Sequence, residues 1–253
     1  MSKRRKVIAA NWKMYKTPEH AREFIASLLP AASGHERDEI VLCPPFTCIP
    51  AVVDALKGAG IFVGGQNMHW ENEGAYTGEI SAPMLVAGGC SHVIIGHSER
   101  RQYFGETDDT VNLKLRSALA AGLKPIVCVG EVIQEREAGL TEDVLRRQCS
   151  VAFREISGGE AIPMAIAYEP VWAIGTGKTA TPEMASAAHE IIRSEAEEVF
   201  GIGVAGQMRI LYGGSVKPEN VKALMAQPEI DGALVGGASL DPKSFAAIVK
   251  YQV

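Results

Sequence analysis

The chain has 253 residues, of which 47% are hydrophobic, and a formal net charge of −5 in which acidic and basic residues are mixed. A chain of this length can bury a sizeable core, and as an α/β barrel it would form one domain over residues 1–253. The charge argues against nucleic-acid and membrane partners. The apolar segment Val7 to Ala10, behind the basic start, is too short for a signal peptide or a membrane span.

The five cysteines are widely spaced and include no C-x-x-C pair. A disulfide framework or a zinc knuckle is therefore not expected. His69 and His92 have no convergent partners in the sequence, and we assign no metal site. The simplest location for such a chain is the reducing cytoplasm.

Short runs rich in Val and Ile recur along the chain, and each is followed by a longer amphipathic segment. We predict strands at Lys6–Ala10, Glu39–Cys43, Ile61–Gly65, His92–Ile95, Lys124–Val129, Met164–Tyr168, Arg209–Tyr212 and Gly232–Val235. Helical patterns lie between them, among them Pro18–Leu29, Thr107–Ala121, Glu142–Ile156 and Pro182–Phe200. Proline is expected in the first turn of helices near Pro18, Pro182, Pro218 and Pro242, because its fixed φ and missing donor suit that position.

The predicted strands are nearly continuous in apolar character, which is typical of parallel strands that helices cover. Eight strand–helix units in about 250 residues match a closed (β/α)8 barrel. The alternative is an open, doubly wound sheet with a G-x-G-x-x-G fingerprint after its first strand. This chain has Asn11-Trp12-Lys13 at that point, so we predict the α/β barrel.

Polar residues follow several predicted strands, at the end of the barrel where chemistry gathers. They are Asn11 and Lys13 after the first strand, His97 and Glu99 after the fourth, Glu169 after the sixth, Ser215 after the seventh, and Gly236 and Gly237 after the eighth. Each alone is more often a solvated loop residue or a hydrogen-bonded structural residue. Together they would bring a base, an acid and a cation to one barrel mouth.

Glycine pairs follow the seventh and eighth strands, at Gly213-Gly214 and Gly236-Gly237. A glycine pair by itself usually marks a tight turn. Two pairs in adjacent loops allow backbone N–H groups to approach an anion, and Ser215 adds a hydroxyl. We therefore expect a phosphate site at these loops.

Five segments in order along the whole chain resemble the triosephosphate isomerase family. They are NWKM at Asn11–Met14, GHSERR at Gly96–Arg101, AYEPVWAIGTGK at Ala167–Lys178, YGGSV at Tyr212–Val216 and LVGGASL at Leu234–Leu240. The resemblance implies a TIM barrel that interconverts dihydroxyacetone phosphate and glyceraldehyde 3-phosphate in glycolysis and gluconeogenesis, without cofactor or metal.

The resemblance also implies roles for the residues at the strand ends. Glu169 matches the general base, and His97 matches the electrophile, kept neutral by a helix start; the family is itself a reference example of this effect. Lys13 and Asn11 match groups that bind the substrate oxygens, and Glu99 matches a supporting acid. Cys128 is expected to be a buried packing residue and not a nucleophile.

In the family, the segment after the sixth strand is a lid that closes over the substrate, and it is a reference example of such gating. Here it comprises Pro170, Val171, Trp172, Ala173, Ile174, Gly175, Thr176, Gly177 and Lys178. Gly175 would offer its N–H to the phosphate. Trp172 alone would more often be a core aromatic, and both interpretations can hold.

The loop Gln66–Glu79 is long for a connection between a strand and a helix. Its pattern resembles the family's interdigitating dimer loop, which implies a homodimer with Thr77, Tyr76 and Met14 at the interface. The alternative is a flap folded on its own subunit.

Two further functional alternatives stay open at this stage. A Schiff-base aldolase would need a lysine inside the barrel, but Lys124 begins its strand, away from the mouth. A non-catalytic scaffold would not need Glu169, His97 and Lys13 together.

Overall fold

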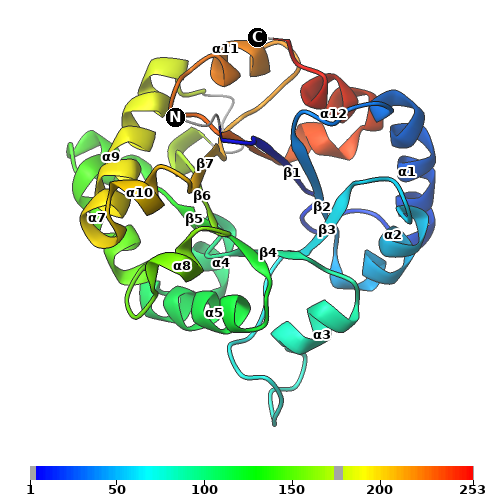
Figure 1. Ribbon diagram of the computed structural model, residues 1–253, viewed down its shortest axis with the longest axis horizontal. Coiled ribbons are helices and arrows are strands. Elements are labelled where there is room, and N and C mark those ends of the chain that lie inside the picture. The colour runs from blue at the N-terminus through cyan, green and yellow to red at the C-terminus, as the bar shows by residue number, and fades with distance from the viewer. Residues whose placement is uncertain (1–3, 174–178, 253) are drawn as a thin grey trace.

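The computed structural model describes residues 4–173 and 179–252. In this part of the chain, eight parallel strands close into a barrel in sequence order, with β8 pairing to β1. The strands are β1 (Val7–Asn11), β2 (Glu39–Cys43), β3 (Phe62–Gly65), β4 (His92–Ile95), β5 (Lys124–Val129), β6 (Ala165–Tyr168), β7 (Arg209–Tyr212) and β8 (Gly232–Val235). Figure 1 views this ring along its axis, with the helices outside it. The closed ring confirms the predicted barrel and excludes the open sheet.

The longer helices cover the outside of the barrel, and short ones lie in the loops. The described helices are α1 (Pro18–Ala32), α2 (Ile49–Ala55), α3 (Ala82–Ala87), α4 (Ser98–Phe104), α5 (Asp108–Ala120), α6 (Ile133–Glu137), α7 (Thr141–Ala152), α8 (Gly158–Ala161), α9 (Pro182–Phe200), α10 (Ile202–Ala205), α11 (Val221–Met225) and α12 (Pro242–Val249). Short 3-10 helices are η1 (Phe46–Cys48), η2 (Val171–Ala173) and η3 (Gly237–Leu240).

Three predicted helix boundaries were wrong: the helix predicted at Glu142–Ile156 ends at Ala152, and the other two differences have identifiable reasons. Helix α1 continues through Pro30 to Ala32, since the carbonyl that Pro30 leaves without a donor belongs to the exposed Ala26 and can face water. Pro218 does not begin a helix: Asn220 Oδ1 accepts the Lys217 N–H at 2.8 Å, which closes a turn before α11.

The strands are buried on both faces, as predicted. In β1 and β2, Val7, Ala9, Val41 and Cys43 belong to a cluster inside the barrel. Their chain neighbours Ile8, Ala10, Ile40 and Leu42 belong to a larger cluster packed against the helices. Because side chains alternate along a strand, this double burial explains the continuous apolar character of the strand sequences.

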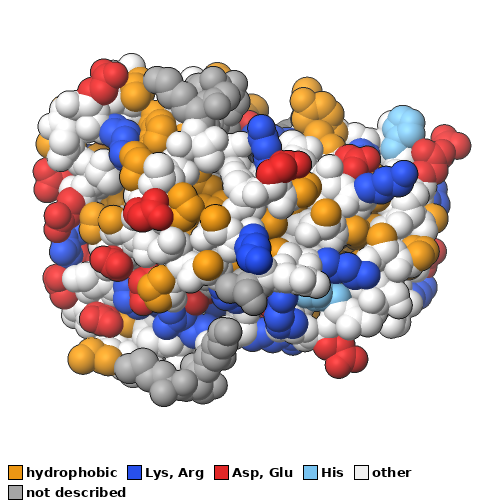
Figure 2. Space-filling model, turned by 90° about the horizontal axis from the view of Figure 1, so that it is seen from above, with side chains coloured by type: hydrophobic (Ala, Val, Ile, Leu, Met, Phe, Trp, Pro, Cys, Tyr) orange, Lys and Arg blue, Asp and Glu red, His pale blue; other side chains and the backbone are white. Residues whose placement is uncertain are grey.

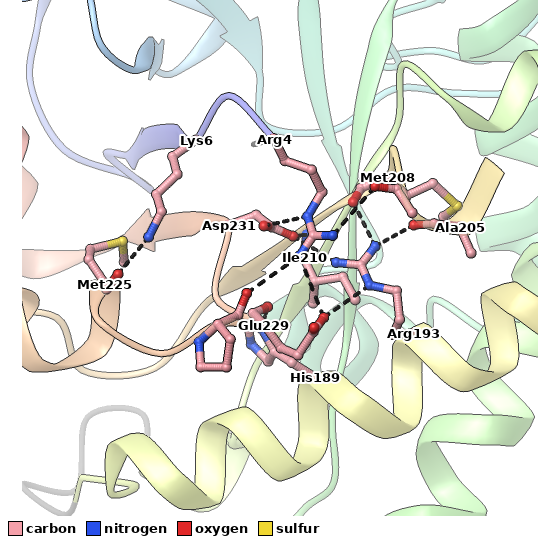
Figure 3. A network of polar contacts seen from close by, with 12 residues as sticks. Arg4, Lys6, His189, Arg193, Ala205, Met208, Ile210, Met225, Glu229 and Asp231 are labelled. Atoms are coloured by element: carbon pink, nitrogen blue, oxygen red, sulfur yellow. Dashed lines mark hydrogen bonds and ion pairs between the residues drawn. The ribbon is translucent and has the colours of Figure 1, made fainter. Parts of the chain in front are cut away.

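A buried polar network ties the amino ends of β7 and β8 to α9 and to the N-terminal segment (Figure 3). Arg193 Nη2 lies 2.8 Å from Asp231 Oδ2, and Nη1 donates to the Met208 carbonyl at 2.7 Å. Arg4 Nε lies 2.6 Å from the other Asp231 oxygen. Paired in this way, the Asp231 carboxylate has partners for both of its oxygens. The network lies at the end of the barrel opposite the strand carboxyl ends.

The flank of the barrel shown in Figure 2 carries both acidic and basic side chains. Among the described residues, no helix combines the length and the apolar character needed to cross a bilayer.

Candidate active site

A pocket of about 790 Å³ opens at the carboxyl ends of the strands. Eight of the residues singled out from the sequence line it: Asn11, Lys13, His97, Glu99, Glu169, Ser215, Gly236 and Gly237. They come from the carboxyl ends of five different strands and the loops that follow. The barrel therefore brings together residues that are up to 226 positions apart in the chain.

Glu169 follows β6 directly, and its side chain is buried in the pocket wall, with only 2% exposed. Its Oε1 lies 2.9 Å from His97 Nε2, and its Oε2 accepts the Ser98 N–H at 2.8 Å. Gly213 makes room for this carboxylate, because a Cβ added there would lie 2.9 Å from Glu169 Cγ. The position of Glu169 thus depends on the loop after β7.

His97 precedes α4 and caps it: its Nδ1 accepts the Glu99 N–H at 3.2 Å. A nitrogen that accepts this hydrogen bond carries no proton, so Nε2 carries the proton and donates to Glu169. The backbone of α4 therefore selects one tautomer of the imidazole and leaves its N–H directed into the pocket.

The buried pair His97 and Glu169 shifts the pKa values of both groups. Burial raises the pKa of the Glu169 carboxyl, but the charge and hydrogen bond of His97 and the N–H of Ser98 outweigh burial and lower it. Burial lowers the pKa of His97, but the charge and hydrogen bond of Glu169 and the charge of Glu99 raise it. The lowered pKa favours an ionised Glu169, which is the form that accepts a proton. The raised pKa of His97 runs against the neutral imidazole expected from the sequence.

Lys13 follows β1 and is held at three points. Its N–H donates to Asn11 Oδ1 at 3.0 Å, and its Nζ lies 2.6 Å from Glu99 Oε1. Its carbonyl accepts from Gln66 Nε2 at 2.8 Å, and Gln66 also donates to the Cys43 carbonyl at 2.9 Å. These bonds hold Lys13 at a φ of 51°, which is unfavourable for a residue with a Cβ.

The loops after β7 and β8 also line the pocket, and the loop after β8 lies beside that after β1. A Cβ added to Gly236 would lie 3.6 Å from Lys13 Cε and 3.9 Å from its Nζ, so the lysine side chain runs along the Gly236 backbone. The Ser215 carbonyl accepts from Asn220 Nδ2 at 2.9 Å, which fixes the loop that carries the hydroxyl. An ammonium, a hydroxyl and glycine backbone thus face one space.

The start of the predicted lid is attached to Glu131, a completely buried carboxylate. Its Oε1 accepts from Trp172 Nε1 at 2.9 Å and from Tyr168 OH at 3.0 Å, and it lies 3.0 Å from Arg136 Nη1. Pro170, Val171, Trp172 and Ala173 are described, and the last three form η2. The lid residues Ile174, Gly175, Thr176, Gly177 and Lys178 lie outside the described residues.

The residues predicted for a subunit interface, Met14, Tyr76 and Thr77, are not among those that line the pocket. The loop between β3 and α3 extends beyond the ring of helices in Figure 1. His69 in this loop stacks on Trp70 at 4.1 Å and lies 4.3 Å from the Tyr76 ring, between centroids. Thr77 is exposed, and Tyr76 and Met14 are 45% and 94% exposed.

Two residues bear on the alternatives. Cys128 is completely buried, and burial raises the pKa of its thiol well above the usual value, so it is not placed as a nucleophile. Lys124 Nζ lies 3.0 Å from Glu39 Oε1 at the amino end of the barrel, away from the pocket. Among the described residues, no group of three or more His, Cys, Asp and Glu side chains is arranged to hold a metal ion.

Gln66 and Glu131 were missed from the sequence. Gln66 belongs to a loop assigned to a subunit interface, and its contacts with Lys13 and Cys43 join three separate strand ends. Glu131 follows Gly130 after β5 and resembles any loop carboxylate. The available signal was a polar residue at or just after the end of a predicted barrel strand: Gln66 follows Gly65 directly, and Glu131 comes two residues after Val129.

Fold and pocket define a (β/α)8-barrel protein whose strand carboxyl ends hold a carboxylate, an imidazole and an ammonium. The sequence model of the triosephosphate isomerase family matches residues 6–252. Triosephosphate isomerase of Solibacter usitatus is 57% identical over 248 residues, covering 98% of this chain and 100% of the relative. That of Moorella thermoacetica is 58% identical over 248 residues, covering 98% and 99%. The chain belongs to the triosephosphate isomerase family, which confirms the resemblance.

Proposed function

We propose that this chain interconverts dihydroxyacetone phosphate and glyceraldehyde 3-phosphate, as an intramolecular isomerase of glycolysis and gluconeogenesis. Membership of the family supports the substrate and the reaction. The observation that carries the mechanism is the 2.9 Å contact between the Glu169 carboxylate and the His97 imidazole inside the pocket. Moving a carbonyl by one carbon requires removal of a C–H proton, an enediolate, and return of a proton to the neighbouring carbon.

In this mechanism Glu169 is the base. Its carboxylate takes the proton from one carbon and returns it to the next, a transfer that contributes about 10²–10⁴-fold to the rate. The hydrogen bonds from His97 and Ser98 keep the carboxylate ionised before substrate binds. When Glu169 turns to the substrate, His97 loses the contact that raises its pKa.

The His97 Nε2–H then faces the substrate oxygens. As a neutral donor it hydrogen-bonds the carbonyl and the hydroxyl in turn, while its Nδ1 keeps the bond from Glu99 N–H. Lys13 supplies a fixed positive charge to the phosphate and the developing oxyanion, and Asn11 donates to the same oxygens. Glu99 supports this arrangement by pairing with Lys13.

The phosphate site is formed by backbone N–H groups of Gly236 and Gly237 and the hydroxyl of Ser215, with Lys13 beside them. This assignment is supported by the position of all four in the pocket. Gly175 adds an N–H when the lid Pro170–Lys178 closes. Closure excludes water, and a dry site protects an enediolate that would otherwise expel phosphate.

The assembly we propose is a homodimer of cytoplasmic, single-domain subunits of residues 1–253. Thr77 of one subunit would reach the partner's site near Asn11 and Lys13, with Tyr76 and Met14 at the same interface. The exposure of Tyr76 and Met14 supports this interface.

The test is turnover of either triose phosphate by the purified protein, with protection by a two-carbon phosphate analogue of the enediolate. We expect turnover that the analogue blocks competitively. If folded protein does not turn over either substrate, the proposed function is wrong.

A further inference from the structure

Lys16 links the loop after β1 to the loop after β8. Its Nζ donates to the Leu240 carbonyl at 2.8 Å. Leu240 is the last residue of η3, where carbonyls have no partner within the helix. At the start of the same turn, the Ser239 N–H and hydroxyl both donate to the Gly236 carbonyl, at 2.8 and 2.7 Å. Ser239 therefore fixes the beginning of the turn, and Lys16 fixes its end.

The Lys16 side chain has a defined place of its own. Its Nζ lies 5.3 Å from the centre of the Trp12 ring and 4.7 Å from that of Phe24. These two rings pack edge to face at 4.9 Å, and Trp12 is completely buried. A cation over two packed rings is held electrostatically as well as by its hydrogen bond. The Trp12 and Phe24 rings, from the loop after β1 and from α1, thus help to position the Lys16 ammonium for its hydrogen bond to the Leu240 carbonyl.

The backbone of Lys16 is also held in an unusual conformation. Its φ is 76°, in the left-handed region that residues with a Cβ avoid. Its carbonyl accepts from Cys48 Sγ at 3.4 Å. A strained conformation persists only where surrounding contacts require it, and such positions gather at functional sites. In this conformation the Lys16 side chain reaches from the loop after β1 to the Leu240 carbonyl of the loop after β8.

The two loops joined by Lys16 meet at the proposed phosphate site, where the Lys13 side chain runs along the Gly236 backbone. We propose that Lys16 is a positioning residue that holds the Gly236–Leu240 turn against Lys13, so that its N–H groups and the Lys13 ammonium converge on one phosphate. This proposal rests on the proposed function for the identity of the phosphate ligand. It assigns a role to a lysine that never touches substrate.

The test compares Lys16→Met, which keeps the apolar stem but loses the ammonium, with Lys16→Arg, which keeps a cation. Lys57→Met is the matched control, because Lys57 is exposed and pairs only locally with Asp54 in the described part of the chain. The measurements are KM and kcat for glyceraldehyde 3-phosphate, the dissociation constant of inorganic phosphate by calorimetry, and Tm.

For Lys16→Met we expect KM and the phosphate dissociation constant to rise about tenfold, as loss of one charged hydrogen bond implies. We expect kcat to fall by less than about threefold, since Glu169 and His97 are untouched. Lys16→Arg should recover most of the phosphate affinity, and Lys57→Met should match the wild type.

A lower Tm with unchanged KM and phosphate affinity would overturn the proposal, since Lys16 would then only stabilise the fold. Should Lys16→Met not fold, Lys16→Gly carries the same test, because glycine adopts the positive φ freely. Phosphate affinity is measured without turnover. A wild type that binds phosphate but lacks activity would therefore contradict the proposed function and leave the Lys16 comparison valid.

Discussion

Glu169 Oε1 lies 2.9 Å from His97 Nε2, and this contact joins the end of β6 to the start of α4 across the pocket. In the proposed mechanism, substrate oxygens and a C–H group take the place of this contact. Substrate binding would then break it, and each side chain would act on a different part of the substrate.

Replacing the base by its isosteric amide, Glu169→Gln, removes proton transfer and leaves the pocket shape. We expect kcat to fall by at least about 10²–10⁴-fold, while inorganic phosphate binds within about threefold of wild type. Glu99→Gln is the comparison, because Glu99 pairs with Lys13 and lies 3.7 Å from His97 Nδ1 but is not the proposed base, so this change should cost less. Full activity of Glu169→Gln would mean that another group is the base.

Gly213→Ala places a methyl group 2.9 Å from Glu169 Cγ and 3.1 Å from the Tyr168 carbonyl. The carboxylate must move to avoid this methyl group. We expect kcat to fall at least tenfold, because displacing a catalytic group by about 1 Å can cost that much in rate. Gly159→Ala is the matched control, because a Cβ added at Gly159 has no atom within 4 Å. Equal kcat values in the two variants would contradict the close approach of Gly213 to the base.

His189 makes folding stability depend on pH. It is completely buried, its Nδ1 lies 2.9 Å from the Glu229 carbonyl (Figure 3), and burial lowers its pKa from 6.5 to about 4. Between these values the unfolded chain binds a proton that the native state does not. Stability from this group is therefore present above about pH 6.5 and is lost as the pH falls toward 4, by about 2–3 kcal/mol.

The measurement is urea unfolding of wild type and His189→Asn at several pH values from 7 down to about 4. The variant should lose stability less steeply across this range, because its amide does not titrate. His20→Asn, at an exposed position, should follow the wild type. Parallel curves for wild type and His189→Asn would show that His189 is not the buried neutral group we describe.

The proposed dimer depends on exposed apolar residues near the pocket. Met14→Glu puts a charge into that interface, and we expect sedimentation at micromolar concentration to shift from one dimeric species toward monomer. Ile202→Glu is the control, because it introduces the same charge at an exposed apolar side chain, 69% exposed, on α10 at the opposite end of the barrel. A wild type that sediments as a fully active monomer would contradict the role given to Thr77.

The strands could be predicted from the sequence, because burial on both faces requires a continuous run of apolar residues. The polar residues that follow each strand could also be predicted, because the apolar run ends where the pocket begins. Glu169 directly follows Ala165–Tyr168 for this reason. The register of the ring, with Ala10 beside Leu42 and Val235, then brings these ends to one face.

The contacts that hold the site could not be predicted in the same way. Lys13 and Lys16 adopt positive φ values that no local sequence preference favours. Lys13 is held by Gln66, which lies 53 residues away in the chain. Lys16 is held by the Leu240 carbonyl, which lies 224 residues away. Tertiary hydrogen bonds of this kind depend on the closed barrel and leave no periodic pattern.

The central claim is that this pocket isomerises a triose phosphate through proton abstraction. The most direct measurement is conversion of glyceraldehyde 3-phosphate in heavy water, followed by proton NMR. We predict dihydroxyacetone phosphate that carries deuterium on carbon, at a rate abolished in Glu169→Gln. The central claim would be contradicted if the folded wild-type protein did not convert the substrate, or if Glu169→Gln converted it at an unchanged rate.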